Sequence, residues 1–569
     1  MPLQWNIQSL PRESHEGAKL PLLEQLLALR GIVSKEDQEL FLVPDYERDL
    51  HDPFLFSAMG FVMERLRQAR KKNEIIGIFG DFDADGITSS VLIREGLSVI
   101  GIAVSVYIPD KHTEGHGLSG KAIDFFESQG VSLIFTVDCG MMNHDEITLA
   151  KSHHMEVIVI DHHHVPEILP EAIAIINPKL PGEPYPFKEL CGAGTTFKVV
   201  QAIYETFAPE KKQELKWLLD IAAVGTVADV MPLIGENRVI VSFGLIVLAK
   251  TRRVGFQEMF AIGSMPIREG RAPVARDIGF HIAPRINAAS RMAHAKIAHD
   301  LLVESDPVRA REFALILESY NTDRRKVSES ISTLVRNIAL ESSEKNLIFA
   351  ADPDFHFGVV GLVAGRIAHE FRKPVIVLTK GKEESRGSLR SIPEVNIIEA
   401  IGQCSDILVK FGGHAQAAGL TIRNEHLLEF EQRLEKLVTE AIGGSDIEPE
   451  IAIDMRVSSA DLSLDFARKI RSFAPFGEGN PEPVFLLENM RVSDIRLVGS
   501  GDKHLKLRLT APGGKVFDAI GFSLADTLPG LKTGEHIDVV FQVDENEWNG
   551  NVTLQLKLLD MRKAEERTG

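Results

Sequence analysis

The stretch Ile75-Ile-Gly-Ile-Phe-Gly-Asp-Phe-Asp-Ala-Asp-Gly86 joins a short apolar run directly to a loop that carries three carboxylates. A short run rich in Ile, with Gly punctuation, is typical of a strand buried on both faces of a parallel sheet. Ligands of such sheets bind beyond the carboxyl ends of the strands, and Asp81, Asp83 and Asp85 follow the carboxyl end here. The stretch therefore predicts an α/β fold with an acidic functional site.

Two interpretations of this loop compete. Alternate carboxylates on an extended turn would chelate one cation, while the flanking Gly80 and Gly86 would let the backbone approach a phosphate. The loop would otherwise be an acidic turn that caps the following helix through Asp85 or Thr88. A calcium-binding loop is excluded because no Glu occupies its twelfth position.

Two more strand-like runs end in polar residues with the same chemistry. Leu133–Val137 leads into Asp138, and Val157–Ile160 leads into Asp161-His-His-His164. Consecutive His side chains point apart, so we expect one to coordinate a metal and the next to donate to a phosphate, with Asp161 as an orienting partner.

Each of these motifs has a plainer structural alternative. Asp138 would be a loop carboxylate satisfied by amides, and Asp229, within Ala228-Asp-Val-Met-Pro232, would be a solvent-exposed helix end. All four motifs in one domain, three of them at strand ends, favour a metal site instead. Oxygen ligands with a little nitrogen suit Mg²⁺ or Mn²⁺. Two close divalent cations held by shared carboxylates would activate water and stabilise both oxygens of a displacement at phosphorus.

Composition sets wider limits. A length of 569 residues suggests three to four domains, and the content of 44% hydrophobic and 25% charged residues is ordinary for a globular protein. The net charge of −18 argues against broad binding to a polyanion but leaves room for a basic groove. Three scattered cysteines, no signal-peptide pattern and no long apolar run indicate a cytoplasmic protein with reduced thiols and no membrane segment.

Pattern changes along the chain divide it into five parts. Strands alternate with helix-length segments in two regions, which predicts two α/β domains. Short strands with turn signals near the end of the chain predict an OB-like β-barrel, although a β-sandwich would produce the same pattern. The predicted parts are a helical region (residues 1–70), a first α/β domain (71–294), a long helical connector (295–345), a second α/β domain (346–445) and the barrel (449–565).

The order of the four acidic motifs resembles the DHH phosphoesterase superfamily, and later motifs resemble its bacterial RecJ family of single-stranded-DNA-specific 5′→3′ exonucleases. Those motifs are Pro284-Arg-Ile-Asn-Ala-Ala-Ser-Arg-Met292, Phe357–Ile367, Gly387-Ser-Leu-Arg-Ser391, Gly412–Gly419 and Pro475-Phe-Gly-Glu-Gly-Asn-Pro-Glu-Pro483. The resemblance runs from about Ile75 to beyond Phe485. Ser290 and Phe357 depart from the usual family residues and put local geometry in doubt more than activity.

The resemblance implies a DHH catalytic domain, a DHHA1 domain and a role for each motif. By it, the metal ligands would be Asp83, Asp85, Asp138 (bridging), His162 and Asp229. The catalytic group would be His163, against the scissile phosphate, with Asp161 and a peripheral Asp81. The substrate-phosphate residues would be Arg285, Ser388, Arg390, His414 and His356. The DNA-binding residues would be Arg291, Lys503, Lys506 and Arg508.

Several of these residues keep an alternative role. Arg285 and Arg390 would otherwise form surface ion pairs, and His414 would be a turn histidine. Lys506 and Arg508 alternate along one predicted strand and would otherwise belong to its solvated face.

The function implied is hydrolysis of single-stranded DNA from the 5′ end with Mn²⁺ or Mg²⁺, two ions in all, releasing 5′-mononucleotides in DNA repair and recombination. A cleft between the two α/β domains would admit one strand and exclude duplex, with a helicase and a single-strand-binding protein as partners. The alternatives are a phosphodiesterase for short oligoribonucleotides or cyclic dinucleotides, an inorganic pyrophosphatase, and an inactive single-strand-binding scaffold.

Overall fold

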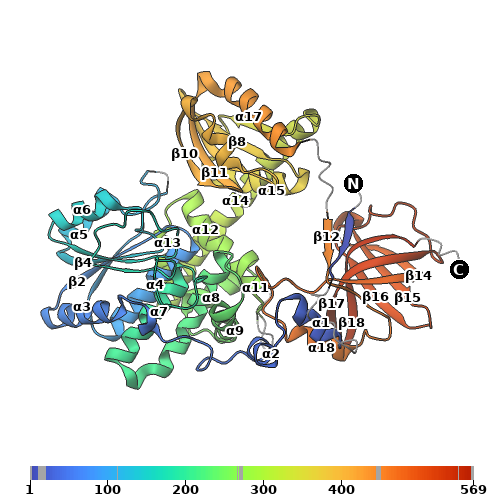
Figure 1. Cartoon of the computed structure of the whole chain (residues 1–569), viewed down its shortest axis with the longest axis horizontal. Helices are drawn as coiled ribbons and strands as arrows, with labels where there is room; N and C mark the ends of the chain where they lie inside the picture. Colours follow the sequence, from blue (N-terminus) through green and yellow to red (C-terminus); the bar gives the residue numbers. More distant parts are fainter. Residues whose placement is uncertain are drawn as a thin grey trace.

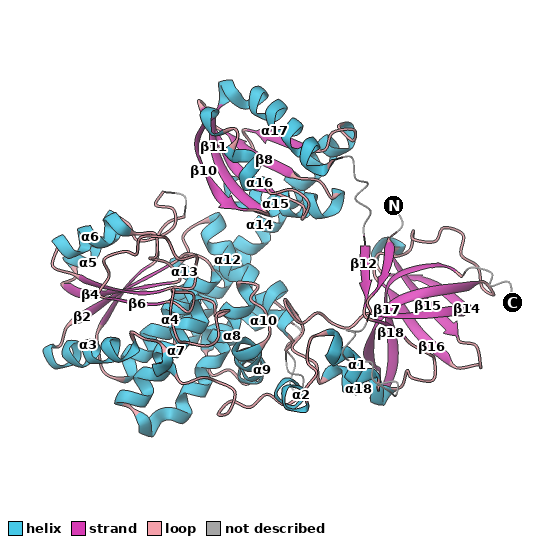
Figure 2. Ribbon diagram, in the orientation of Figure 1, coloured by secondary structure: helices cyan, strands magenta, loops and turns pink. Residues whose placement is uncertain are grey.

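A computed structural model describes residues 3–9, 21–111, 113–265, 267, 273–443, 450–548 and 550–564. Three bodies are visible in Figures 1 and 2: a large α/β domain, a smaller α/β domain above it, and a β-barrel to one side. No helix among the described residues is both long enough and apolar enough to cross a membrane.

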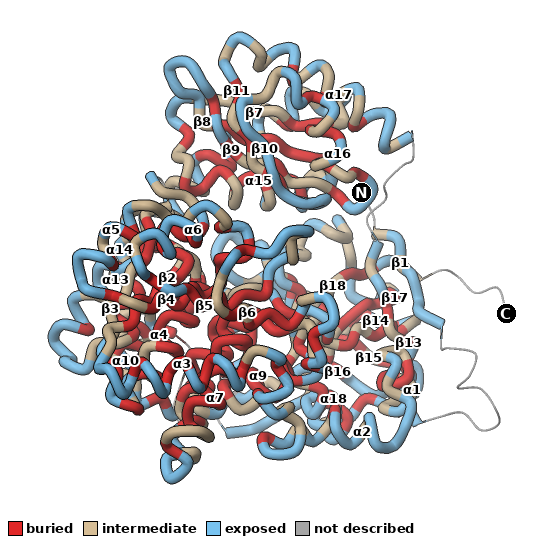
Figure 3. Tube along the Cα trace, turned by 60° about the vertical axis from the view of Figure 1, so that its left-hand side comes forward, coloured by how far each residue is buried: buried red, intermediate tan, exposed pale blue. Residues whose placement is uncertain are grey.

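The large domain is built on a parallel sheet in the order β3-β2-β4-β5-β6. Its strands are β2 (Ile75–Gly80), β3 (Val104–Tyr107), β4 (Val131–Val137), β5 (Glu156–Ile160) and β6 (Ala174–Ile176). The central strands are buried on both faces, as Figure 3 shows, so the apolar runs predicted as buried strands are confirmed.

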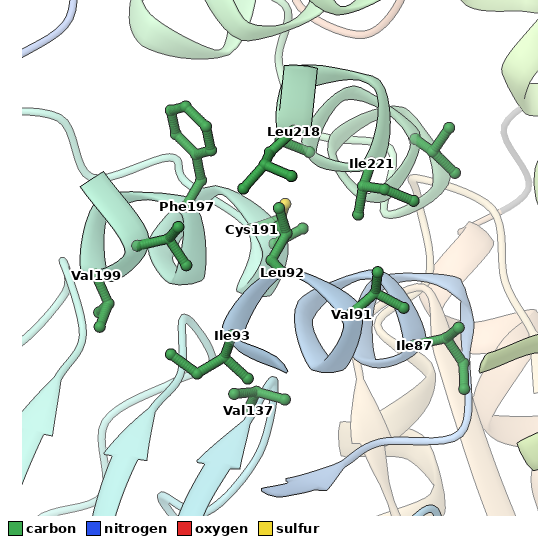
Figure 4. Packing of buried hydrophobic residues seen from close by; sticks show 14 of the residues in the cluster. Ile87, Val91, Leu92, Ile93, Val137, Cys191, Phe197, Val199, Leu218 and Ile221 are labelled. Atoms are coloured by element: carbon green, nitrogen blue, oxygen red, sulfur yellow. The ribbon is translucent and has the colours of Figure 1, made fainter. Parts of the chain in front are cut away.

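Helices cover both faces of this sheet. On one face α5 (Gly120–Ser128) and α6 (His144–Ser152) pack on Phe79, Ile134 and Val159. On the other face lie α3 (Met59–Lys72), α4 (Ala84–Val99) and α7 (Gly192–Phe207). Figure 4 shows Leu92 of α4 facing Cys191 at the start of α7, with Leu218 and Ile221 of the following helical layer near by in the same hydrophobic core.

That helical layer completes the large domain and leads to the smaller one. It comprises a 3-10 helix (Pro209–Leu218), α8 (Leu219–Ala228), α9 (Gly235–Ala249), α10 (Val254–Ile262), α11 (Ala275–Asp277), a π-helical turn (Ile278–Ile282) and α12 (Ala283–Met292). The predicted connector is two helices, α13 (Lys296–Val303) and α14 (Pro307–Glu341). The break falls where Asp306 caps α14 and Pro307 occupies its first turn.

The smaller domain has a mixed sheet in the order β10-β11-β9-β8-β7, in which only β7 and β8 pair in parallel. Its elements are β7 (Ile348–Asp352), α15 (Phe357–Phe371), β8 (Val375–Lys380), β9 (Glu384–Arg390), α16 (Ile397–Gly402), β10 (Leu408–His414), β11 (Ala417–Arg423) and α17 (Leu427–Ile442). Helix α15 packs on β8 and β9, the face from which Ser388 projects.

The C-terminal strands close into a five-stranded barrel, which excludes the sandwich. Closure comes from the pairing of β14 with both β15 and β17. The strands are β13 (Met455–Arg456, alongside β14), β14 (Phe485–Val498), β15 (His504–Thr510), β16 (Val516–Gly521), β17 (His536–Trp548) and β18 (Asn551–Lys563), with α18 (Leu464–Arg471). Strand β14 pairs with β17 through an irregularity between Leu487 and Met490.

The N-terminal region differs from the expected helical segment. Strand β1 (Gln4–Ile7) pairs in parallel with β12 (Glu450–Ile453), a segment more than four hundred residues away. Helices α1 (Leu22–Leu29) and α2 (Lys35–Leu42) bury their apolar side chains in the core of the barrel, whereas α3 belongs to the large domain. A four-residue strand that depends on so distant a partner leaves no local pattern in the sequence.

Candidate metal centre and phosphate site

The loop after β2 uses its three carboxylates differently. Asp83 caps α4, because its Oδ1 accepts from the amides of Asp85 (2.9 Å) and Gly86 (3.1 Å). The alternative prediction that this loop caps the helix is correct, but the capping residue is Asp83 and not Asp85 or Thr88. Thr88 instead donates to the carbonyl of Ala84 at 2.8 Å.

Asp85 connects this loop to the N-terminus of α7. Its two oxygens accept from the amides of Gly192 (2.7 Å) and Ala193 (2.8 Å). A Cβ added at Gly192 would lie 2.6 Å from Cβ and Oδ1 of Asp138. The helix N-terminus can approach both carboxylates only because residue 192 has no side chain.

Asp138 lies at the end of β4 in a left-handed conformation, with φ at 60°. Its amide donates to the carbonyl of Ile160 at 2.9 Å, which ties it to the end of β5. A non-glycine residue in this region is uncommon and marks local strain, of the kind that gathers at functional sites.

The turn after β5 directs two histidines to different surroundings. Asp161 Oδ1 accepts from the backbone amide of His162 (2.7 Å) and contacts Nδ1 of His163 (2.8 Å), and Oδ2 accepts from Met141 (3.2 Å). The His162 side chain is 7% exposed and the His163 side chain 56%. Asp161 thus orients the turn, with one imidazole buried in the site and the other open to a ligand.

The side chains meet in three overlapping groups whose candidate ligand atoms lie within 4.8 Å of one another. These groups are Asp85, His162 and Asp229; Asp81, Asp83 and Asp138; and Asp138, His162 and His163. Within them His162 Nε2 is 3.2 Å from Asp138, 3.6 Å from Asp229 and 3.8 Å from Asp85. Asp138 belongs to two of the groups. A carboxylate has two oxygens, so one shared in this way suits two neighbouring cations.

Unsatisfied polar atoms show that the residues fit divalent cations. Within the described part of the chain, both ring nitrogens of His162, Oδ1 of Asp138 and Oδ1 of Asp81 are buried without a hydrogen-bond partner. A buried polar atom left in this state costs about 1–3 kcal/mol. Oxygen donors with one or two imidazoles suit Mg²⁺ or Mn²⁺.

The electrostatics of the site favour the same ligand. Burial, followed by repulsion from neighbouring carboxylates, raises the pKa of Asp83 to about 6 and of Asp229 to about 8, and raises the pKa of Asp138 well above its usual range. Burial lowers the pKa of His162 to about 4, so its imidazole is neutral, as a metal ligand must be. Without a cation these carboxylates repel one another.

A basic cluster lies beside the acidic loop, made of Lys111, Arg291 and Arg390 with the hydroxyl of Ser388. Lys111 Nζ lies 5.2 Å from the centre of the Phe82 ring. Burial, then the charge of Arg291, lowers the pKa of Lys111 to about 8. Among the described residues none of the three cations has a carboxylate within ion-pair distance. Cations held together without a direct ion pair favour an anionic ligand.

In the smaller domain, Gly361 of α15 has no side chain and so leaves space for this cluster. Ser388 and Arg390 project from β9 toward α15, where a Cβ at Gly361 would lie 3.1 Å from Ser388 Oγ and 3.3 Å from Arg390 Nη2. Arg291, at the end of α12, donates to the carbonyl of Gly358 at 3.2 Å. The cluster is therefore assembled where the two α/β domains meet.

Family models match successive parts of the chain: "DHH family, N-terminal domain" over residues 75–226, "DHHA1 domain" over 344–442 and "RecJ OB domain" over 453–560. Relatives named single-stranded-DNA-specific exonuclease RecJ from Bacillus subtilis (strain 168) and Escherichia coli (strain K12) are 34% and 32% identical. The alignments cover 99% and 97% of this chain, and 70% and 99% of those proteins.

The chain belongs to the RecJ family.

Solved structures of RecJ from Thermus thermophilus have the same architecture. The complex with Mn²⁺ superposes with a TM-score of 0.80 at 27% identity, covering 99% of this chain and 80% of that chain. The complex with Mg²⁺ gives a TM-score of 0.75, also at 27% identity, and covers 99% and 79%. The expected RecJ resemblance and the three-part fold are confirmed.

The structure gives Arg285 a different place from the one expected of a RecJ phosphate residue. Its guanidinium is buried, forms an ion pair with Glu318 at 2.5 Å and donates to the carbonyl of His281 at 2.6 Å. These contacts favour the ion-pair alternative, although the pair is buried rather than on the surface.

The two expected phosphate histidines of the DHHA1 domain differ in position. His414 is exposed on β10 and shares a cross-strand row, through Ala417, with Arg390. His356 caps α15, because its Nδ1 accepts from the amide of Gly358 at 3.1 Å. Both lie on the side of the DHHA1 domain that carries the basic cluster.

The expected DNA-binding stripe of the OB domain is not near the metal centre. Lys506 and Arg508 are exposed on β15, between buried leucines, and Lys503 precedes them. Figure 1 shows β15 on the side of the barrel away from the two α/β domains. Arg508 also lies 3.5 Å from Asp518. The position favours the solvated strand face for this stripe.

Three contributors escaped the sequence-based prediction. Lys111 belongs to the basic cluster, Gly192 lets α7 approach Asp138, and Asn287 Oδ1 accepts from the amide of Ala84 at 2.8 Å. Asn287 stood within a motif quoted for the resemblance, so a signal existed for it. The other two depend on contacts between distant segments, for which one sequence offers no local sign.

Proposed function

We propose that this chain is a single-stranded-DNA-specific exonuclease that degrades DNA from the 5′ end by metal-dependent phosphodiester hydrolysis. The observation that carries the proposal is the set of three overlapping groups of carboxylates and histidines, which lies beside a basic cluster without direct ion pairs. The groups of carboxylates and histidines would hold cations, and the basic cluster suits the terminal phosphate of the strand. Membership of the RecJ family, whose named relatives are single-stranded-DNA-specific exonucleases, supports the substrate.

Two divalent cations, Mn²⁺ or Mg²⁺, would be held by Asp83, Asp85, Asp138, His162 and Asp229, and Asp81 lies at the edge of this group. Such cations lower the pKa of water and stabilise both oxygens exchanged at phosphorus. The chain's own residues position the rest of the reaction. The hydrogen bond that His163 Nδ1 donates to the Asp161 carboxylate raises the pKa of His163 to about 9, so this exposed imidazole is charged and can donate to the scissile phosphate.

Arg390, Ser388, Lys111 and Arg291 would bind the 5′-terminal phosphate, with His356 and His414 near by. A guanidinium matches a phosphate with two parallel hydrogen bonds. Hydrolysis breaks the bond between phosphorus and the 3′ oxygen of the terminal nucleotide, so the shortened strand carries a new 5′-phosphate. The same residues bind that phosphate, and the product is a 5′-mononucleotide.

The position of the cluster between two domains suits one strand rather than two. Only a terminal phosphate on an unpaired strand would reach both Arg390 of the DHHA1 domain and the carboxylates of the DHH domain. We place the catalytic unit at residues 71–294 and 346–445, with the barrel (449–565) as the single-strand-binding part. The cytoplasm is the proposed location, and a single-strand-binding protein and a helicase are the proposed partners in repair and recombination.

The test compares a single-stranded 5′-phosphorylated oligonucleotide with its blunt duplex, in Mn²⁺, Mg²⁺ or EDTA. We expect mononucleotides from the single strand only, and none in EDTA. Equal digestion of duplex would contradict the proposal, and cleavage limited to di- and trinucleotides would assign the chain to the oligonucleotide branch of the superfamily. Binding without cleavage would indicate the inactive scaffold.

A further inference from the structure

A glycine loop of the OB domain lies directly on the segment that carries Asp229. The amide of Leu233 donates to the carbonyl of Glu478 at 2.8 Å. A Cβ at Gly477 would lie 2.7 Å from Leu233 Cδ1, and one at Gly479, whose φ is 68°, would lie 2.9 Å from Pro232 Cβ. The contact leaves little room for a Cβ at either glycine, so the loop lies close against Pro232 and Leu233.

A buried arginine connects the two domains beside this contact. Arg238, in the first turns of α9, is 3% exposed. Its guanidinium donates to four carbonyls, those of Phe41 (2.9 Å), Phe473 (2.9 Å), Ala474 (2.8 Å) and Ser472 (3.3 Å). Among the described residues it has no carboxylate within ion-pair distance. Because four of its five N–H groups donate to carbonyls, the guanidinium fixes the start of the glycine loop relative to α9.

The glycine loop is itself rigid. Asn480 is 1% exposed, and its amide nitrogen donates to the carbonyls of Phe473 (2.8 Å) and Pro475 (2.9 Å). Its Oδ1 accepts from Arg30 Nε at 3.2 Å, which brings in the N-terminal helices. Backbone hydrogen bonds between Gly477 and Asn480 close the turn. A loop held by hydrogen bonds at both ends moves with the barrel, so the position of the barrel affects the segment that the loop contacts.

The Asp229 segment needs such support. Val230 has φ at 56°, a strained conformation for a β-branched residue. From within the DHH domain, Asn237 Nδ2 donates to the carbonyl of Pro232 at 3.1 Å. The glycine loop supplies the contact on the opposite side, at Leu233. The segment is therefore held between the DHH domain and the OB domain.

We propose that the glycine loop Phe473–Asn480, fastened by Arg238, is a positioning element of the metal centre, so that the OB domain sets the position of Asp229. This rests on the proposed role of Asp229 as a metal ligand. The OB domain then affects the centre even when no DNA touches the barrel. Groups that orient metal ligands commonly change metal affinity by about 10–100-fold when they are altered.

The test is Gly479→Ala, with Gly513→Ala as the matched control. Both glycines lie in loops of the OB domain with positive φ, 68° and 99°, but Gly513 has nothing within 4 Å of its Cβ position. Titration calorimetry of the full-length protein with Mn²⁺ alone measures affinity without DNA. We expect Gly479→Ala to weaken Mn²⁺ binding roughly tenfold. It should also lower kcat, with KM unchanged, on a 5′-phosphorylated dinucleotide, while Gly513→Ala matches the wild type.

Wild-type affinity for Mn²⁺ in Gly479→Ala, with weaker binding of long strands only, would overturn the proposal, and so would a lower melting temperature with unchanged Mn²⁺ affinity. If Gly479→Ala does not fold, Arg238→Lys provides the same comparison, since a lysine cannot donate to four carbonyls. A wild type that binds no Mn²⁺ would instead contradict the proposed function.

Discussion

At the scale of single residues, Asp138 destabilises the metal-free folded state at the position where the site would bind a cation. Its backbone is strained in φ. Burial, followed by repulsion from neighbouring carboxylates, raises its pKa well above the usual range. An acid whose folded-state pKa is raised loses stability as pH rises above its unfolded value near about 4. The metal-free protein therefore carries a cost that a cation would remove.

Asp138→Asn removes the charge and keeps the shape, and asparagine tolerates a positive φ. The metal-free variant should melt above the metal-free wild type at pH 8, by about 2–4 °C for each kcal/mol of repulsion relieved. The difference should shrink toward pH 4. Mn²⁺ should raise the melting temperature of the wild type only, and activity should fall by about 100-fold or more. Scanning calorimetry with and without Mn²⁺ checks this, and equal stabilisation of both proteins would contradict it.

Substitutions of Arg390 and Arg285 should distinguish a residue that binds the 5′-phosphate from one that stabilises the fold. Arg390→Ala should reduce the preference for a 5′-phosphate over a 5′-hydroxyl about tenfold, the effect of losing one charged hydrogen bond. Arg285→Ala should keep the preference and lower the melting temperature, because it breaks the ion pair with Glu318. The measurement is kcat/KM on the two kinds of oligonucleotide. Loss of end preference in Arg285→Ala alone would reverse the assignment.

At this scale the sequence predicted which residues gather but not how each is used. Asp83, Asp138 and His162 follow strand ends, and parallel strands bring their carboxyl ends to one edge. The engagement of Arg285 depends on Glu318, which lies on a helix thirty-three residues away. Such a partner is a matter of packing, and spacing along the chain does not reveal it.

Among the elements, the N-terminus of α7 contacts two of the candidate ligands without supplying one itself. Its first amides bind Asp85, and its first residue lies against Asp138. Gly192→Ala should cost about 1–3 kcal/mol of stability through overpacking and should weaken Mn²⁺ binding. Gly120→Ala is the control, because Gly120 also begins a helix of this domain and its nearest neighbour would be 3.9 Å away. Calorimetry that finds the two variants alike would refute this role of α7.

Some helices and strands could be predicted from the pattern of apolar and capping residues alone, and others could not. The apolar runs before Asp81 and Asp138 were predicted correctly as strands because burial on both faces leaves a continuous signal. The break between α13 and α14 has a signal too, in Asp306-Pro307. Strand β1 has none, since its pairing with β12 joins opposite ends of the chain.

At the scale of the whole molecule, the N-terminal helices pack into the C-terminal barrel. Leu26, Leu27 and Phe41 are buried in the barrel core, although they precede the DHH domain. A fragment of residues 1–443 should therefore aggregate, because removing the barrel exposes these side chains. A fragment of residues 44–443 lacks them and should remain monomeric. Light scattering of the two fragments is the check, and a monomeric 1–443 fragment would show that α1 and α2 fold without the barrel.

The domain plan was predictable because each domain has its own strand pattern, but contacts between domains were not. Arg238 stands in an ordinary helical pattern, and nothing near it indicates that four carbonyls of distant segments surround its guanidinium. Charge gave as little guidance. A net charge of −18 conceals a basic cluster made of residues from three separate segments.

The most direct test of the central claim is digestion of a single-stranded oligonucleotide labelled at the 5′ or the 3′ end, with Mn²⁺ and with Asp138→Asn as the inactive control. We predict that the 5′ label appears at once as a mononucleotide while the 3′ label remains on a progressively shorter strand. Release of the 3′ label first, internal cuts, or activity in Asp138→Asn equal to that of the wild type would contradict a metal-dependent 5′→3′ exonuclease.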